Sequence, residues 1–87
     1  MSKFNSELIE YAKASGAFEY AVKRYLANKS DANLRAEVDS TFNYLENVAF
    51  KIIVDIYEQS PNDAEAMSVY EIASNDMSLM RLIFNNL

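Results

Sequence analysis

The side chains in this 87-residue chain that could do chemistry are mainly carboxylates. The chain has no histidine and no cysteine, which excludes the commonest general base, the thiol nucleophile and any Cys/His metal site. Two acidic pairs could bind Mg²⁺ or exchange protons: Glu37 with Asp39, and Asp55 with Glu58. Residues two apart do not share a helical face, and an acidic pair three apart is ordinary on a helix surface. We therefore expect no enzyme, no cofactor and no metal site.

A cluster of basic and aromatic residues is the best candidate for a ligand site. It surrounds the first turn of the predicted fold and consists of Tyr20, Lys23, Arg24, Tyr25, Lys29 and Arg35. Basic side chains contact phosphate oxygens and tyrosine rings stack on bases, so a small anionic ligand such as a nucleotide or cyclic nucleotide could bind here, above all in an oligomer. The alternative is a solvated helix end whose cations complement the helix dipole. The absence of a glycine-rich phosphate loop favours that alternative.

Net charge limits the classes of partner. The formal charge of −5 is uneven, since residues 1–36 carry six basic and four acidic side chains, and residues 37–87 carry two and nine. A negative surface repels nucleic-acid backbones and anionic lipids, so we expect no direct binding to nucleic acid or to membranes. The acidic part could act as a DNA mimic, but its acids are widely spaced, and this favours a solubilising surface. Without a signal sequence or a membrane-spanning apolar run, the chain is expected to be cytoplasmic.

Three stretches with helical periodicity must position these residues. The expected helices span about 6–28, 31–59 and 61–86, and none shows the alternation of a strand. Apolar residues recur at intervals of four and three, which keeps them on one helical face. The stripes are Phe4, Leu8, Tyr11, Ser15, Phe18, Val22 and Tyr25; Leu34, Val38, Thr41, Leu45, Val48 and Ile52; and Ala66, Tyr70, Ala73, Met77, Met80, Phe84 and Leu87. Short connections make successive helices antiparallel, so residues 1–87 are predicted to form one all-α domain, a small antiparallel three-helix bundle.

Capping residues predict where the second and third helices begin. Ser30 or Asp31 is the expected N-cap of the second helix. The third helix is expected to start with Ser60 as its cap, Pro61 at the first helical position and Asp63 two positions later.

Two positions weaken the expected helices. Gly16 costs about 1 kcal/mol relative to alanine inside a helix, and it permits either close approach by a neighbouring helix or a kink. Residues 74–76 are Ser, Asn and Asp, which are poor helix formers. A third helix broken near Asn75 is therefore an alternative to a continuous one.

The chain has more large apolar residues than a core-facing stripe requires, which is about three positions in seven. Those that lie beside the main stripes or add to them are Phe50, Ile53, Val54, Tyr57, Leu79 and Ile83. We interpret these six as a candidate surface for a protein partner or for self-association into a homo-oligomer. The alternatives are a central helix that buries a wide face against two neighbours, and a methionine-rich third helix that is plain core.

In its short length, its glycine-poor and asparagine-rich composition and its lack of catalytic residues, the chain is similar to small accessory proteins of tailed phages. Many of these inhibit or sequester one host factor. The resemblance implies a non-catalytic acidic interaction protein that binds and occupies or inhibits a protein partner, in the host cytoplasm if phage-encoded. Helical-hairpin phage proteins that sequester cyclic nucleotides are similar in size and layout, so an oligomer that binds a small anionic ligand is an alternative. An acidic DNA-mimic inhibitor is another.

Overall fold

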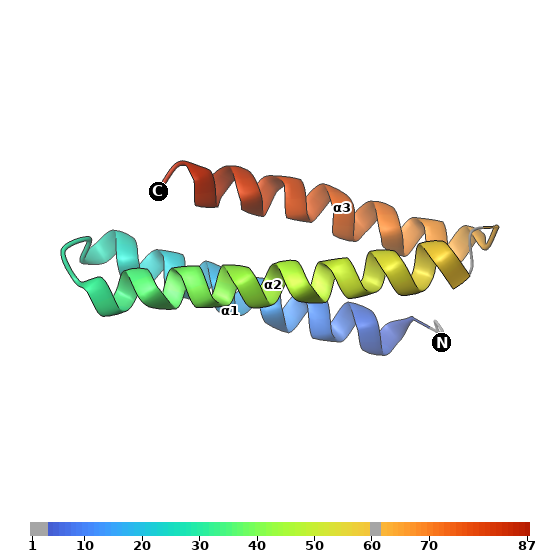
Figure 1. Ribbon diagram of the computed structural model, residues 1–87, viewed down its shortest axis with the longest axis horizontal. Helices are drawn as coiled ribbons and strands as arrows, with labels where there is room; N and C mark the ends of the chain where they lie inside the picture. Colours follow the sequence, from blue (N-terminus) through green and yellow to red (C-terminus); the bar gives the residue numbers. More distant parts are fainter. Residues whose placement is uncertain (1–3, 60–61) are drawn as a thin grey trace.

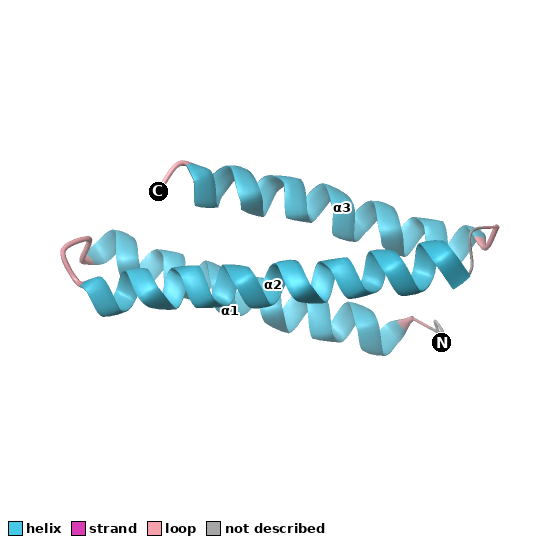
Figure 2. Ribbon diagram, viewed as in Figure 1, coloured by secondary structure: helices cyan, strands magenta, loops and turns pink. Residues whose placement is uncertain are grey.

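The computed structural model describes residues 4–59 and 62–87, and they form three α-helices. Helix α1 spans Asn5–Ala27, α2 spans Ala32–Gln59 and α3 spans Ala64–Asn85. Figure 2 shows that the rest of the described chain consists of the short connections and the chain ends. The predicted all-α three-helix fold is confirmed, and the predicted helix boundaries are correct to within one helical turn.

Helix α2 lies between the other two and runs antiparallel to both, so α1 and α3 run parallel to each other (Figure 1). Helices α1 and α2 pack most closely, α2 and α3 pack well, and α1 and α3 touch far less. The bundle is therefore elongated and flat, measuring 47 × 22 × 14 Å over its Cα atoms. Its radius of gyration is 14.3 Å, whereas a compact chain of this length has about 12 Å. This flattened arrangement leaves wide exposed flanks on α1 and α3.

The core is one apolar cluster to which all three helices contribute. Its largest fully buried side chains are Phe18, Val38, Leu45, Ile52 and Ile56. Helix α3 adds Ala66, Val69, Ala73, Met77 and Met80. The predicted stripes therefore face the core. Burial of this apolar surface, at roughly 25 cal/mol per Å², is the main favourable term in folding.

Three phenylalanines join the helices at one end of this core. The ring centroids of Phe18 in α1 and Phe42 in α2 are 5.3 Å apart. Phe42 in turn stacks on Phe84 of α3 at 4.1 Å, with the two rings almost parallel. Aromatic pairs at these distances contribute beyond the area they bury. The cluster thus ties the C-terminal part of α3 to the other two helices.

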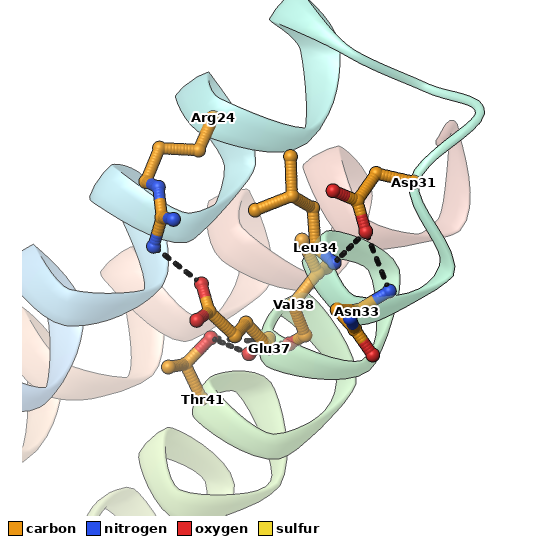
Figure 3. A network of polar contacts seen from close by, with 7 residues as sticks. All are labelled: Arg24, Asp31, Asn33, Leu34, Glu37, Val38 and Thr41. Carbon is orange, nitrogen blue, oxygen red and sulfur yellow. Dashed lines mark hydrogen bonds and ion pairs between the residues drawn. The ribbon is translucent and has the colours of Figure 1, made fainter.

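Helix α2 begins at an aspartate cap. Oδ1 of Asp31 accepts hydrogen bonds from the backbone N–H groups of Asn33 and Leu34, at 2.8 and 3.3 Å (Figure 3). Of the two predicted caps, Asp31 is therefore the N-cap of α2. The hydroxyl of Ser30 instead donates to Oδ1 of Asn28.

Helix α3 also begins at an aspartate cap, and here the prediction was wrong. Oδ1 of Asp63 accepts hydrogen bonds from the N–H groups of Glu65 and Ala66, at 2.9 and 3.2 Å. Asp63 is thus the N-cap rather than a residue of the first turn, because its short carboxylate reaches the free N–H groups directly. The predicted roles of Ser60 and Pro61 lie outside the described residues.

Helix α3 continues without interruption through residues 74–76, so the alternative of a break near Asn75 is wrong. The hydroxyl of Ser78 donates to the backbone carbonyl of Ser74 at 3.1 Å, and Asp76 is held by a side chain of α1. The helix propensities of residues such as serine, asparagine and aspartate are lower than that of alanine by about 0.7 kcal/mol per residue or less. Tertiary contacts readily outweigh differences of this size.

Gly16 makes no use of its missing side chain. It is exposed in the middle of α1, and a Cβ atom at this position would meet nothing within 4 Å. No neighbouring helix therefore needs a glycine there. We expect Gly16→Ala to stabilise the protein by about 0.5–1 kcal/mol, because alanine loses less backbone entropy on folding. The Tm in thermal unfolding followed by circular dichroism should rise by roughly 2–8 °C.

The matched control is Ala12→Gly, at another exposed position of the same helix. We expect it to lower the Tm by a similar amount, for the opposite reason. A Tm that falls in Gly16→Ala would contradict the prediction and would mean that α1 needs a glycine for its shape.

Candidate functional site

The two acidic pairs lie on the surface of α2. Glu37 and Asp39 each form an ion pair with an arginine, and Asp55 and Glu58 are exposed on α2. Within residues 4–59 and 62–87, no group of three or more acidic side chains is placed to hold a metal ion. In the same part of the chain, no helix combines the length and the apolar character needed to cross a bilayer.

The predicted basic and aromatic cluster is divided between different sides of the bundle. Arg24 of α1 faces α2, where its Nη1 lies 2.7 Å from Oε2 of Glu37 (Figure 3). Its guanidinium also lies 5.6 Å from the centre of the Tyr20 ring. Tyr20 lines a shallow groove between α1 and α2. Lys23 instead lines a pocket between α1 and α3, so these residues do not converge on one ligand.

Arg35 is occupied by contacts within the protein. Its Nε lies 3.2 Å from Oδ1 of Asp39, and its guanidinium lies 5.5 Å from the Tyr25 ring and 5.4 Å from the Phe84 ring. Arg35 therefore covers the end of the core, where cation–π contacts contribute about 0.5–1 kcal/mol at an exposed site. Of the six predicted residues, Lys23 and Lys29 are exposed cations for which the described residues provide no ion pair.

Two of the six predicted apolar surface residues line a groove between α2 and α3. The groove has a volume of about 370 Å³, and Phe50 and Ile53 of α2 lie opposite Met77 of α3. Phe50 is 67% exposed, and Ile53 is half-buried. A salt bridge of 3.1 Å between Nη2 of Arg81 and Oε2 of Glu46 borders the groove. We call this site the Phe50 groove.

The other predicted surface residues lie elsewhere. Ile83 lines a pocket of about 210 Å³ between α1 and α3, together with Phe18 and Val22. Leu79, one helical turn earlier, is exposed. Val54 is half-buried on α2, and the side chain of Tyr57 lies outside the described residues. The five described residues of the six thus lie on separate parts of the bundle.

One polar contact between α1 and α3 was not predicted from the sequence. The hydroxyl of Tyr11 donates to Oδ2 of Asp76 at 2.5 Å, and the hydroxyl of Ser15 lies 3.4 Å from the same atom. Tyr11 is only 6% exposed. Its burial raises the pKa of the phenol above its ordinary value, and the hydrogen bond and negative charge of Asp76 raise it further.

This contact is structural in character. A phenol with a raised pKa stays protonated at neutral pH and acts as a hydrogen-bond donor, whereas a general base must be deprotonated at the working pH so that it can accept a proton. The one signal in the sequence is that a tyrosine in a core stripe needs a partner for its hydroxyl. The identity of that partner, 65 residues further along the chain, depends on how α1 and α3 are aligned.

No protein-family model, curated protein or solved structure matches this chain. The fold and the surface define a small three-helix protein with a groove of mixed polar and apolar lining beside an exposed aromatic side chain. Since folds of this kind serve many functions, the function has to be argued from the surface.

Proposed function

We propose that the protein is a non-catalytic interaction module that binds a protein partner through the Phe50 groove and acts by occupying that partner. The observation that carries this proposal is Phe50, which is 67% exposed at the edge of the groove. Full burial of a phenylalanine side chain is favourable by about 1.5–3 kcal/mol. Aromatic side chains that enter or flank a pocket are typical energetic centres of protein interfaces.

The chemistry of the Phe50 groove suits a helical partner segment. Its lining combines the apolar side chains of Ile53 and Met77 with polar ones, among them the Glu46–Arg81 salt bridge. Enrichment in phenylalanine, methionine and arginine is typical of protein interfaces. The small side chains of Ser74 and Ser78 line the same groove. An amphipathic helix is the segment that fits such a groove between two helices.

The two alternative functions receive less support from the geometry. A site for an anionic ligand needs unpaired cations, but Arg24 and Arg35 are each paired with a carboxylate. A DNA mimic needs free carboxylates, but Glu37, Asp39 and Glu46 are each paired with an arginine. In both cases, ion pairs within the protein occupy part of the charge that the ligand or target would have to meet, while Lys23, Lys29, Asp55 and Glu58 stay exposed.

The test places a photo-crosslinking benzoylphenylalanine at position 50 and irradiates the protein in the cells that encode it. The expected result is one predominant adduct, which an excess of unmodified protein suppresses and an excess of Phe50→Asp does not. The control carries the same amino acid at position 44, where Tyr44 is an exposed aromatic residue elsewhere on α2. The same adducts from both positions, or none from position 50, would contradict the proposal.

A further inference from the structure

Helix α3 carries a second stripe on the side away from the core, which we call the outer stripe. Its residues follow one another at intervals of four and three and all are exposed: Ser68, Ile72, Asn75, Leu79, Leu82 and Asn86. The three large apolar members, Ile72, Leu79 and Leu82, are 56%, 51% and 60% exposed. This spacing is typical of a helix that packs along its length against another helix. No other helix of the described chain covers the outer stripe.

The charges on α3 favour an antiparallel second copy as the occupant. The acidic residues are Glu65 and Glu71 in its N-terminal half and Asp76 near its middle, and the carboxylate of Asp76 is turned to Tyr11 of α1. The one charged residue that follows is Arg81. Arg81 is turned to Glu46 of α2. Two parallel copies would bring these acidic residues together, and like charges close to one another are destabilising. Two antiparallel copies that overlap along their C-terminal parts avoid this repulsion.

One antiparallel register also matches the polar positions of the outer stripe. With Leu79 opposite Leu82 of the second copy, Asn75 lies opposite Asn86, and the overlap covers residues 74–87. Glu65, Glu71 and Ile72 then lie outside the overlap, whereas Asp76 lies within it but is turned to Tyr11 of α1. Asparagine within such a stripe selects register at some cost in stability. Nδ2 of Asn86 donates to the carbonyl of Leu82 at 2.7 Å, so its Oδ1 can accept from Asn75 of the second copy.

We infer that the protein forms a homodimer in which the C-terminal part of the outer stripe, from Asn75 to Asn86, packs antiparallel on the same part of a second copy. This goes beyond the proposed function, because the Phe50 groove shares no residue with the outer stripe. The dimer carries two Phe50 grooves. A partner with two binding segments would therefore gain affinity by binding both at once.

The first test is the solution mass, measured by sedimentation equilibrium over a concentration series. The expected mass at high concentration is twice 9.9 kDa. The double variant Leu79→Asp with Leu82→Asp places charges in the interface. Uncompensated buried charge costs several kcal/mol, so dimerisation should weaken by more than about 100-fold. Because both leucines are exposed, the helical circular dichroism spectrum should be retained.

The matched control is Ile9→Asp with Leu26→Asp, which changes two exposed apolar residues of α1 and should dimerise as the unmodified protein does. An unmodified protein that stays at 9.9 kDa throughout, or a dimer that survives the Leu79 and Leu82 changes, would overturn the inference. Loss of the dimer should leave the adduct from position 50 unchanged, so this inference and the proposed function can fail separately.

The second test is disulfide cross-linking. Because the unmodified chain has no cysteine, any disulfide must come from the introduced residues. In the inferred register, a mixture of the Asn75→Cys and Asn86→Cys proteins should form a mixed disulfide quickly under mild oxidation, because the two Cα atoms come within bonding range. Each variant alone should not cross-link faster than Glu58→Cys, an exposed position on α2. Rapid cross-linking of Asn75→Cys to itself would indicate parallel helices and would overturn the antiparallel arrangement.

Discussion

Replacing Phe18 by alanine is expected to lower the free energy of unfolding by about 3–5 kcal/mol. Phe18 is 0% exposed, and its ring lies 5.3 Å from Phe42 and 6.5 Å from Phe84. The alanine leaves a cavity where all three helices meet, and it removes the ring contacts of α1 with Phe42 and Phe84. Domains are typically stable by only about 5–15 kcal/mol. Urea unfolding followed by circular dichroism should therefore show a large fall in the midpoint.

The control for this prediction is the same substitution at Phe50. Because Phe50 is 67% exposed, Phe50→Ala should change the unfolding free energy by no more than about 0.5 kcal/mol. The pair separates a phenylalanine that holds the fold together from one that is available for binding. Equal losses in the two variants would show that Phe50 belongs to the core, and this would also remove the main support for the proposed function.

Replacing Tyr11 by phenylalanine is expected to change how stability depends on pH. At pH 7 the variant loses the hydrogen bond to Asp76, at a cost of about 1.5–3 kcal/mol for a bond to a charged group. Folding raises the pKa of the Tyr11 phenol above the ordinary value of 10.0. Above that pH the unfolded chain binds fewer protons than the folded chain, so the stability of the unmodified protein falls as the pH rises.

The fall amounts to about 1.4 kcal/mol per pH unit for one group. The unmodified protein should therefore be more stable than Tyr11→Phe from pH 7 to pH 10, and its advantage should disappear near pH 11–12. Urea unfolding of both proteins at a series of pH values measures this difference. Tyr44→Phe, which removes an exposed hydroxyl, is the control for the substitution itself. A difference between Tyr11→Phe and the unmodified protein that is constant up to pH 12 would contradict the raised pKa.

The fold could be predicted from the sequence because its main signal is periodic. Val38, Leu45 and Ile52 occur at helical intervals, and all three are buried as that spacing requires. The start of α3 was misplaced, because Ser60 and Asp63 are both good caps and the choice depends on where the connection ends. The continuity of α3 at Asn75 could not be predicted, since it depends on the contact of Asp76 with α1.

The candidate site was less predictable because it depends on how the helices are rotated about their axes. The basic residues lie near the turn between α1 and α2, but the sequence does not indicate which faces of the two helices meet. The pairing of Arg24 with Glu37 depends on those faces. Phe50 was expected beside the core from its place off the main stripe, and it is exposed. The groove next to it also needs Met77 and Arg81 of α3, and no local pattern relates these residues to α2.

The order of the helices along the chain also affects how fast the protein folds. Each helix packs mainly on the next one in the sequence, and α1 and α3 contribute few of the contacts. Contacts between neighbouring segments close only short loops, so the relative contact order is low, and helical domains of this kind fold in about microseconds to milliseconds. Ribosomes add roughly 5–20 residues per second. The pair of α1 and α2 therefore has time to form before α3 is complete, and the outer stripe of α3 is made after that pair.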